Sequence, residues 1–420
     1  MDTDTDQFFN DNIFEGNDDK ESKNAWGIES EPEPEPELEV DIVDVTTFDE
    51  IGLKDELLRG LYSYGFEKPS KIQCRAIPLV LSKGDIIAQS QSGTGKTGAF
   101  SISTLQLIDE NEHSIQAIII SPTHELSRQT QSFIENISTY MKIKICSAIG
   151  GTNVGECKSN LQKNPHIIVG TPGRILDMLN KGYINTSKLK IMVFDEADEI
   201  LSSGFKDSIY NIVKQTPKNT QMCLFSATIP KDVIELTNKF MNNPKRLLMK
   251  NEVLTLEGIK QYYVNTKDNN WKYDVLIDIY ETISISQCII YCNSKKRVNE
   301  LGNTLKNNDF PVLMIHGEMN SDERKEIMEK FKAGEARILI STDLLSRGID
   351  VQQLSLVINF DLPIENETYI HRIGRSGRYG RKGIAINFMT DRDTYRLKEI
   401  EKFYNTQIQE MPHNFIDYLN

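Results

Sequence analysis

Long hydrophobic runs are missing from this sequence of 420 residues. Runs such as Ala117–Ile120 are far too short to cross a bilayer, which takes about 20 apolar residues, so no transmembrane helix is expected. The first residues, Met1–Asp6, have neither a basic start nor an apolar core, and they predict no secretory signal peptide. We therefore expect a protein without a membrane partner.

Cysteines are also few and scattered. Among the six, only Cys288 and Cys292 lie close together, and no second pair or nearby histidine completes a zinc site. We expect reduced core residues, as in an intracellular protein. No basic cluster resembles a nuclear localisation signal, so the cytoplasm is the default expectation for the location.

An excess of positive charge is absent too, because the net charge is −13. Residues 1–44 hold 16 acidic and 2 basic side chains, whereas residues 45–420 hold 46 basic and 45 acidic ones. The repelling carboxylates and the prolines of Glu31–Glu37 predict that residues 1–44 are a disordered tail. The near-neutral remainder neither demands nor excludes a nucleic-acid partner.

A different pattern begins at Phe48. Leu53, Leu57, Leu58 and Leu61 recur at helical spacing before Gly65. Short β-branched runs then alternate with helical stretches, which predicts an α/β fold with parallel sheets covered on both faces. The expected strands form two series of six: 85–90, 116–121, 144–149, 166–170, 191–194 and 221–225, then 261–264, 287–291, 312–315, 337–341, 356–360 and 383–388. We expect domains at 45–249 and 259–420, joined by a linker at 250–258.

The first expected strand runs into Ser90-Gln91-Ser92-Gly93-Thr94-Gly95-Lys96-Thr97. Glycines let successive backbone N–H groups surround phosphate oxygens at a helix N-terminus. Lys96 would reach the β- and γ-phosphates of a nucleotide, and the Thr97 hydroxyl would bind Mg²⁺. The alternative is an ordinary glycine-rich turn.

A second motif, Asp195-Glu196-Ala197-Asp198, follows the fifth expected strand. Asp195 would hold Mg²⁺ through water, and Glu196 would orient and deprotonate the attacking water. The alternative is an acidic turn. Further on, His371–Arg378 gathers three arginines between glycines, and Arg375 and Arg378 would stabilise charge on the γ-phosphoryl group. A nucleic-acid phosphate patch is the competing interpretation of this segment.

Together with Phe48, Gly65–Gln73 and Ser226-Ala227-Thr228, these motifs resemble those of the DEAD-box RNA helicases of superfamily two. The resemblance covers residues 45–420 and implies two RecA-like domains in tandem. It is strongest to the translation-initiation subgroup and its exon-junction relative, through Leu58–Gly60, Leu254–Ile259, Asp343–Gln353 and Ile400–Pro412.

The resemblance implies roles for individual positions. Gln73 would read the adenine edge with Phe48 stacked on the ring, and Gly348 and Asp350 would touch ATP. Ser226, Thr228 and His371 would couple nucleotide and RNA binding between the domains. The implied contacts to single-stranded RNA are sequence-independent and come from Pro122, Thr123, Gly150, Gly151, Thr171, Pro172, Gly173 and Arg174, and from Asn293, Arg324 and Thr342.

This chain departs from the family pattern at His124, where arginine is usual, and at Ser127 and Ser90, where alanine is usual. Because neutral imidazole dominates near pH 7, we expect weaker or more pH-sensitive RNA binding from His124. The Ser90 side chain is small enough to fit.

The sequence thus predicts an enzyme that hydrolyses ATP with Mg²⁺ in response to RNA and locally separates short duplexes, with translation initiation on mRNA as its context. A helical-repeat scaffold protein that bridges the domains is a further expected partner. Three alternatives stay open: an ATP-gated RNA clamp in exon-junction or splicing-linked complexes, a P-loop kinase or signalling NTPase, and a DNA helicase.

Overall fold

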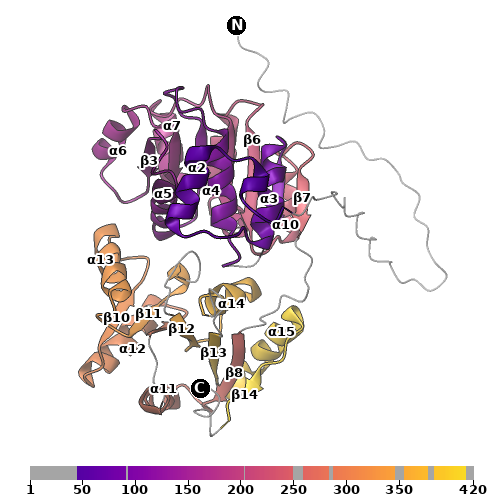
Figure 1. Ribbon diagram of the computed structural model, residues 1–420. Helices are drawn as coiled ribbons and strands as arrows, with labels where there is room; N and C mark the ends of the chain where they lie inside the picture. The colour runs from indigo at the N-terminus through magenta and orange to yellow at the C-terminus, as the bar shows by residue number, and fades with distance from the viewer. Residues whose placement is uncertain are drawn as a thin grey trace, which may run out of the picture. The chain divides into compact units, whose positions relative to one another are not determined.

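The computed structural model describes residues 45–90, 93–202, 204–248, 259–282, 287–345, 354–376 and 383–412. These residues fall within one compact unit that contains two separate sheets, one from residues 45–248 and one from residues 259–412 (Figure 1). The expected tail at 1–44 and the expected linker at 250–258 lie outside the described residues.

The first sheet has the strand order β3-β4-β2-β5-β6-β1-β7, and every neighbouring pair is parallel. Its strands are β1 Ile86–Gln89, β2 Ala117–Ile120, β3 Ile145–Ala148, β4 Ile167–Gly170, β5 Ile191–Asp195, β6 Gln221–Ser226 and β7 Lys245–Leu248. Its helices are η1 Asp49–Ile51, α2 Asp55–Tyr64, α3 Lys71–Leu81, α4 Lys96–Leu107, α5 His124–Ile137, α6 Val154–Leu161, α7 Pro172–Asn180, α8 Ala197–Ser202, α9 Lys206–Lys214 and α10 Lys231–Thr237.

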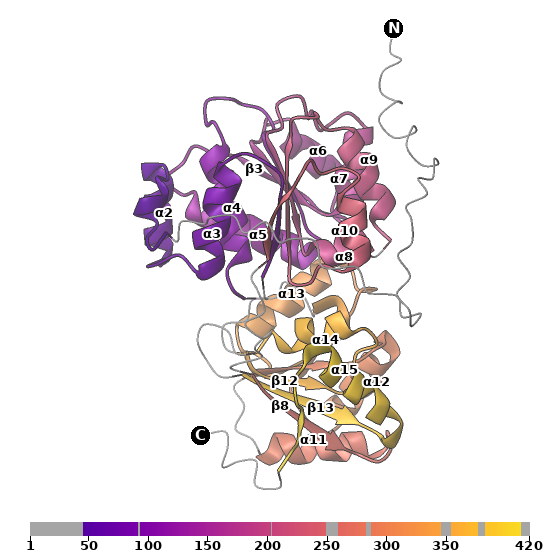
Figure 2. The same cartoon turned by 90° about the vertical axis from the view of Figure 1, so that its right-hand side faces the viewer.

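Alternation along the strands divides the core of this first domain in two. Ile119 and Val193 pack with α2–α5 on one face, whereas Ile118 and Met192 pack with α6–α9 on the other. Figure 2 shows α2–α5 on one side of the sheet and α8–α10 on the opposite side. Both faces are therefore buried, and ligands are left with the carboxyl edge of the sheet.

The second sheet repeats this plan with the order β10-β11-β9-β12-β13-β8-β14, again all parallel. Its strands are β8 Ile259–Asn265, β9 Gln287–Tyr291, β10 Val312–Ile315, β11 Ile338–Ser341, β12 Leu354–Asn359, β13 Gly383–Met389 and β14 Gln409–Glu410. The helices are α11 Trp271–Thr282, α12 Lys295–Asn307, α13 Ser321–Lys332, η2 Asp343–Leu345, α14 Asn366–Ile373, η3 Asp391–Asp393 and α15 Thr394–Tyr404.

The expected α/β fold with two parallel sheets is confirmed, and each of the twelve expected strands is present. The expected count of six strands per sheet is wrong, because β7 and β14 each add an edge strand. Helix α2 ends as expected, with Gly65 in the left-handed region at φ 100°. All six cysteines are free thiols, and five of them are buried. Among the described helices, none has the length and apolar character needed to span a bilayer.

Candidate nucleotide and RNA site

The phosphate loop leaves β1 and enters α4, as the sequence predicts. Gly93 and Gly95 adopt φ values of 81° and 107°, which a residue with a Cβ rarely adopts. Lys96 is buried at the N-terminus of α4, where its Nζ donates to the Ser90 carbonyl oxygen over 2.6 Å. Burial lowers the pKa of Lys96, and the nearby carboxylates of Glu196 and Asp195 oppose that shift. Ser92 lies outside the described residues.

Gln73 lies against this loop. Its Oε1 accepts from the Ser70 N–H over 2.9 Å, and its Nε2 donates to the Gly95 carbonyl oxygen over 3.2 Å. A Cβ at Gly98 would lie 2.4 Å from that Nε2, and one at Gly95 would lie 2.7 Å from it. Both glycines are therefore needed for the close approach of the Gln73 amide to the phosphate loop.

Phe66, rather than Phe48, lies beside Gly98 in the first turn of α4. Phe48 is fully buried and meets Phe66 edge-on, with ring centroids 5.7 Å apart. Phe66 is only half-buried, and its Cζ lies 3.8 Å from the position of a Cβ on Gly98. The Phe48 ring has no exposed face on which an adenine would stack, and Phe66 was not singled out for this role from the sequence.

Two buried carboxylates lie at the carboxyl end of β5. Asp195 and Glu196 are 2% and 5% exposed, and Asp195 Oδ2 has no hydrogen-bond partner among the described residues. Burial, and then the charge of Glu196, raise the pKa of Asp195 to about 8. Glu196 has a φ of 51°, in the left-handed region, which costs a residue with a side chain about 1 kcal/mol or more. An unpartnered buried carboxylate oxygen suits Mg²⁺ or its bound water, so the residues present fit this ion.

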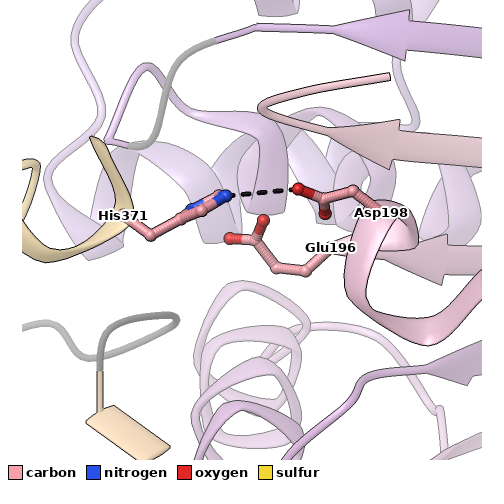
Figure 3. Close-up of side chains that lie close together, drawn as sticks. All are labelled: Glu196, Asp198 and His371. Carbon is pink, nitrogen blue, oxygen red and sulfur yellow. Dashed lines mark hydrogen bonds and ion pairs between the residues drawn. The ribbon is translucent and has the colours of Figure 1, made fainter. Parts of the chain in front are cut away.

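Asp198 connects the motifs of both domains. Its Oδ2 accepts from the Thr228 hydroxyl over 2.6 Å and lies 3.2 Å from His371 Nε2 (Figure 3). Its backbone N–H donates to Ser226 Oγ over 3.4 Å. The ligand atoms of Glu196, Asp198 and His371 all lie within 4.8 Å of one another. The three expected coupling residues therefore meet at Asp198, to which the sequence pattern assigned no role.

The arginines that follow His371 differ from one another. The Arg375 guanidinium is buried, its Nε donates to the His371 carbonyl oxygen over 3.1 Å, and its charge contributes to lowering the pKa of Lys96. Arg372 is fully buried and donates to Asn293 Oδ1 over 2.8 Å and to Asp343 Oδ2 over 3.0 Å. Arg378, Gly348 and Asp350 lie outside the described residues.

The RNA-binding residues expected in the first domain lie in the loops at the carboxyl ends of β2, β3 and β4 and in the first turn of α7. Thr123 caps α5 by accepting from the Leu126 N–H, and Thr171 Oγ1 accepts from the Gly150 N–H over 3.1 Å. The structure thus links loops from neighbouring strands, and hydrogen bonds from Arg174 to Thr152 brace them. The predicted members are Pro122, Thr123, Gly151, Thr171, Gly173 and Arg174.

The residues expected to bind RNA in the second domain have different surroundings. Asn293 follows β9, and its side chain donates to the Leu362 carbonyl oxygen over 2.7 Å. Thr342 lies between β11 and η2. Arg324 is not open to solvent, because its guanidinium contacts Glu125 Oε1 at 3.1 Å and His124 Nδ1 at 2.7 Å.

The pKa of His124 argues against the expected pH-sensitive RNA binding between pH 6 and pH 8. Burial, followed by the charges of Arg324, Arg128 and Arg174, lowers the pKa of His124 to about 4. The ring is therefore neutral throughout this range.

Two parallel α/β domains, with a phosphate loop in the first and a histidine and arginine from the second beside the carboxylates, define a tandem RecA-like nucleotide-dependent motor. Residues 70–236 match the DEAD/DEAH box helicase family, and residues 271–380 match the helicase conserved C-terminal domain. The chain therefore belongs to the DEAD-box family of ATP-dependent RNA helicases.

Individual relatives agree with this assignment. The chain is 50% identical over 375 residues to Eukaryotic initiation factor 4A of Caenorhabditis elegans, and the matched region covers 89% of this chain and 93% of that protein. It is 54% identical over 375 residues to the ATP-dependent RNA helicase eIF4A of Yarrowia lipolytica, which covers 89% of this chain and 95% of that protein. Among solved structures, S. cerevisiae Dbp5 bound to RNA and ADP BeF3 has a TM-score of 0.82 and 40% identity, and it covers 87% of this chain and 95% of that one.

Proposed function

We propose that this protein binds single-stranded RNA without regard to sequence and locally separates short duplexes during translation initiation. ATP and RNA bind cooperatively to the two domains, and hydrolysis releases the RNA. The observation that carries this proposal is the meeting of Thr228 and His371 at Asp198 Oδ2. A carboxylate from the motif beside the phosphate loop is thereby tied to the second domain, so that nucleotide binding and domain contact influence one another.

The residues of the first domain divide the work on ATP. The backbone of Ser92–Gly95 and the ammonium of Lys96 would hold the phosphates, and Gln73 would read the adenine edge. The exposed part of the Phe66 ring supports stacking by Phe66, with Phe48 as its buried support.

The reacting group requires cations and a base. Thr97 and Asp195 would hold Mg²⁺, which supplies positive charge to the phosphate oxygens. Glu196 would orient the attacking water and accept its proton. From the second domain, Arg375 and Arg378 would stabilise charge on the γ-phosphoryl oxygens, and Gly348 and Asp350 would contact the nucleotide.

RNA would follow the loops at the carboxyl edges of both sheets. Small residues such as Gly151 and Gly173 present backbone N–H groups, which suit phosphate and 2′-OH contacts that carry no base identity. In the second domain Asn293 and Thr342 would contact the RNA. The hydrogen bond from Arg372 to Asn293 Oδ1 supports RNA binding by Asn293, because it fixes the side chain.

The remaining assignments belong to the same proposal. The domains would extend over 45–249 and 259–420, with the linker at 250–258. Because translation initiation takes place on cytoplasmic ribosomes, the location would be the cytoplasm, and a helical-repeat scaffold would be a partner. The relatives named eIF4A favour initiation over the exon-junction clamp.

The test is the ATPase rate of the full-length chain with and without single-stranded RNA, alongside single-stranded DNA of equal length. We expect RNA, but not DNA, to raise the ATPase rate, and we expect ATP-dependent displacement of a short RNA duplex. Equal stimulation by DNA would overturn the substrate assignment. RNA binding without displacement would favour the clamp.

A further inference from the structure

His124 and Glu125 begin α5 in the first domain, and both contact Arg324 of α13 in the second domain. The Arg324 guanidinium lies 2.7 Å from His124 Nδ1 and 3.1 Å from Glu125 Oε1. The Arg324 side chain is only 7% exposed and that of Glu125 12%, so both charges are largely removed from water. A contact of this kind is stronger than one between solvated side chains.

The chemistry of this contact fixes the tautomer of the imidazole. A guanidinium only donates hydrogen bonds, so His124 Nδ1 is the acceptor and the ring proton resides on Nε2. The lowered pKa of His124, about 4, agrees with a neutral ring. The arginine that is usual in the family at this position has no acceptor and would repel Arg324.

The other ring nitrogen of His124 lies beside an expected RNA-binding loop. A Cβ at Gly150 would lie 3.0 Å from His124 Nε2, so glycine leaves room for the imidazole there. The Gly150 N–H already donates to Thr171 Oγ1. The polar donor that the imidazole of His124 adds beside this loop is therefore its Nε2–H. Backbone phosphate is the acceptor that such a donor would meet on RNA.

We propose that His124 is a positioning residue that links RNA binding to domain contact: its Nδ1 accepts from Arg324, and its Nε2–H donates to an RNA phosphate beside Gly150. This inference rests on the proposed RNA helicase function. Where the family usually has the fixed positive charge of an arginine beside the RNA, this chain has a neutral imidazole. Its Nδ1 accepts a hydrogen bond from Arg324 of the second domain. RNA held by Nε2 thereby orients the acceptor that Arg324 requires.

Substitutions at position 124 test the contributions of the two ring nitrogens separately. His124→Asn places an acceptor oxygen near the position of Nδ1, His124→Gln places an amide near Nε2, and His124→Ala removes both. The readout is the affinity for fluorescent single-stranded RNA with and without a non-hydrolysable ATP analogue. Their ratio measures the linkage, and the exposed His113 provides a matched control as His113→Ala.

Hydrogen bonds involving a charged group predict about a tenfold effect per contact. We expect His124→Gln to lower the linkage about tenfold while keeping nucleotide-free RNA affinity. His124→Asn should do the reverse, and His124→Ala should lose both. His124→Arg should raise nucleotide-free RNA affinity but lower the linkage, two opposite changes that a merely structural role would not produce.

Equal values for Asn, Gln and Ala at position 124, or values equal to the unsubstituted protein, would overturn the inference. Additive effects of His124→Gln and Arg324→Ala in a double-mutant cycle would also overturn it, because partners in contact couple. An unsubstituted protein whose RNA affinity ignores the analogue would instead refute the proposed function.

Discussion

Replacing Asp198 by asparagine should uncouple ATP hydrolysis from RNA while leaving the fold intact. Asp198 Oδ2 receives both the Thr228 hydroxyl and His371 Nε2. Asparagine has the same shape but no charge. A hydrogen bond to a charged group contributes about 1.5–3 kcal/mol and a neutral one about 0.5–1.5 kcal/mol, so each contact should lose about 1–2 kcal/mol.

Of the two contacts that Asp198 Oδ2 makes, only the one to His371 joins the two domains. The RNA-stimulated rate should therefore fall by about 5- to 30-fold, since about 1.4 kcal/mol corresponds to a factor of ten. Thr228→Val removes the contact within the first domain and should have a smaller effect. ATPase rates measured against RNA concentration, with the KM for ATP, separate loss of stimulation from loss of nucleotide binding.

The matched control is Asp177→Asn, which removes an exposed carboxylate paired with Lys181 and should change neither quantity. If Asp198→Asn keeps the RNA-stimulated rate within about twofold of the unsubstituted protein, the contact to His371 does not transmit the presence of RNA. The central observation behind the proposed function would then lose its force.

Three further predictions concern single residues. Glu196→Gln should keep ATP and RNA binding but reduce single-turnover hydrolysis by about 100-fold or more, and persistent hydrolysis would exclude Glu196 as the base. Gly98→Ala places a Cβ 2.4 Å from Gln73 Nε2 and should weaken ATP binding about tenfold by calorimetry, whereas Gly204→Ala, with open space around it, should not. The pKa of His124 is about 4 in the folded protein, against an ordinary value of 6.5, so the unfolded chain takes up the proton first as pH falls. Between pH 7 and pH 5 the unfolding free energy should therefore fall by about 1 kcal/mol more than in His124→Gln, after discounting for solvent at the half-buried ring, and equal losses in denaturant titrations would contradict this.

The parts of the site that the sequence predicted are those encoded by contiguous residues. The phosphate loop around Lys96 and the pair Asp195–Glu196 each lie where a buried strand ends, and parallel strands bring their carboxyl ends to one edge. The central strands could also be predicted, because burial on both faces of the sheet requires nearly continuous apolar residues. Edge strands escape this rule: β7 begins with Lys245 and Arg246, and β14 has only two polar residues.

Long-range contacts account for what the sequence did not reveal. Asp198 acts through Thr228, 30 positions later, and through His371, 173 positions later. The sequence singled out Phe48 for stacking, but its ring is fully buried, whereas the ring of Phe66 is partly exposed. The sequence predicted Arg324 as an RNA-binding cation, yet its guanidinium contacts both Glu125 and a neutral His124, which lies 200 positions away. Spacing along the chain carries no signal for such contacts.

The charges beside the phosphate loop explain why the first domain should not hydrolyse ATP by itself. Asp195, Glu196 and Asp198 are three buried acidic side chains near the ammonium of Lys96, and burial, followed by the charge of Glu196, raises the pKa of Asp195. ATP adds further negative charge, which low-dielectric surroundings make costly. In the proposed mechanism Mg²⁺ would offset part of that charge, and Arg375, whose charge contributes to lowering the pKa of Lys96, would offset more. Because Arg375 belongs to the second domain, the proposed transition state would require both domains, and we expect anything that holds them in contact, such as RNA, to raise the rate.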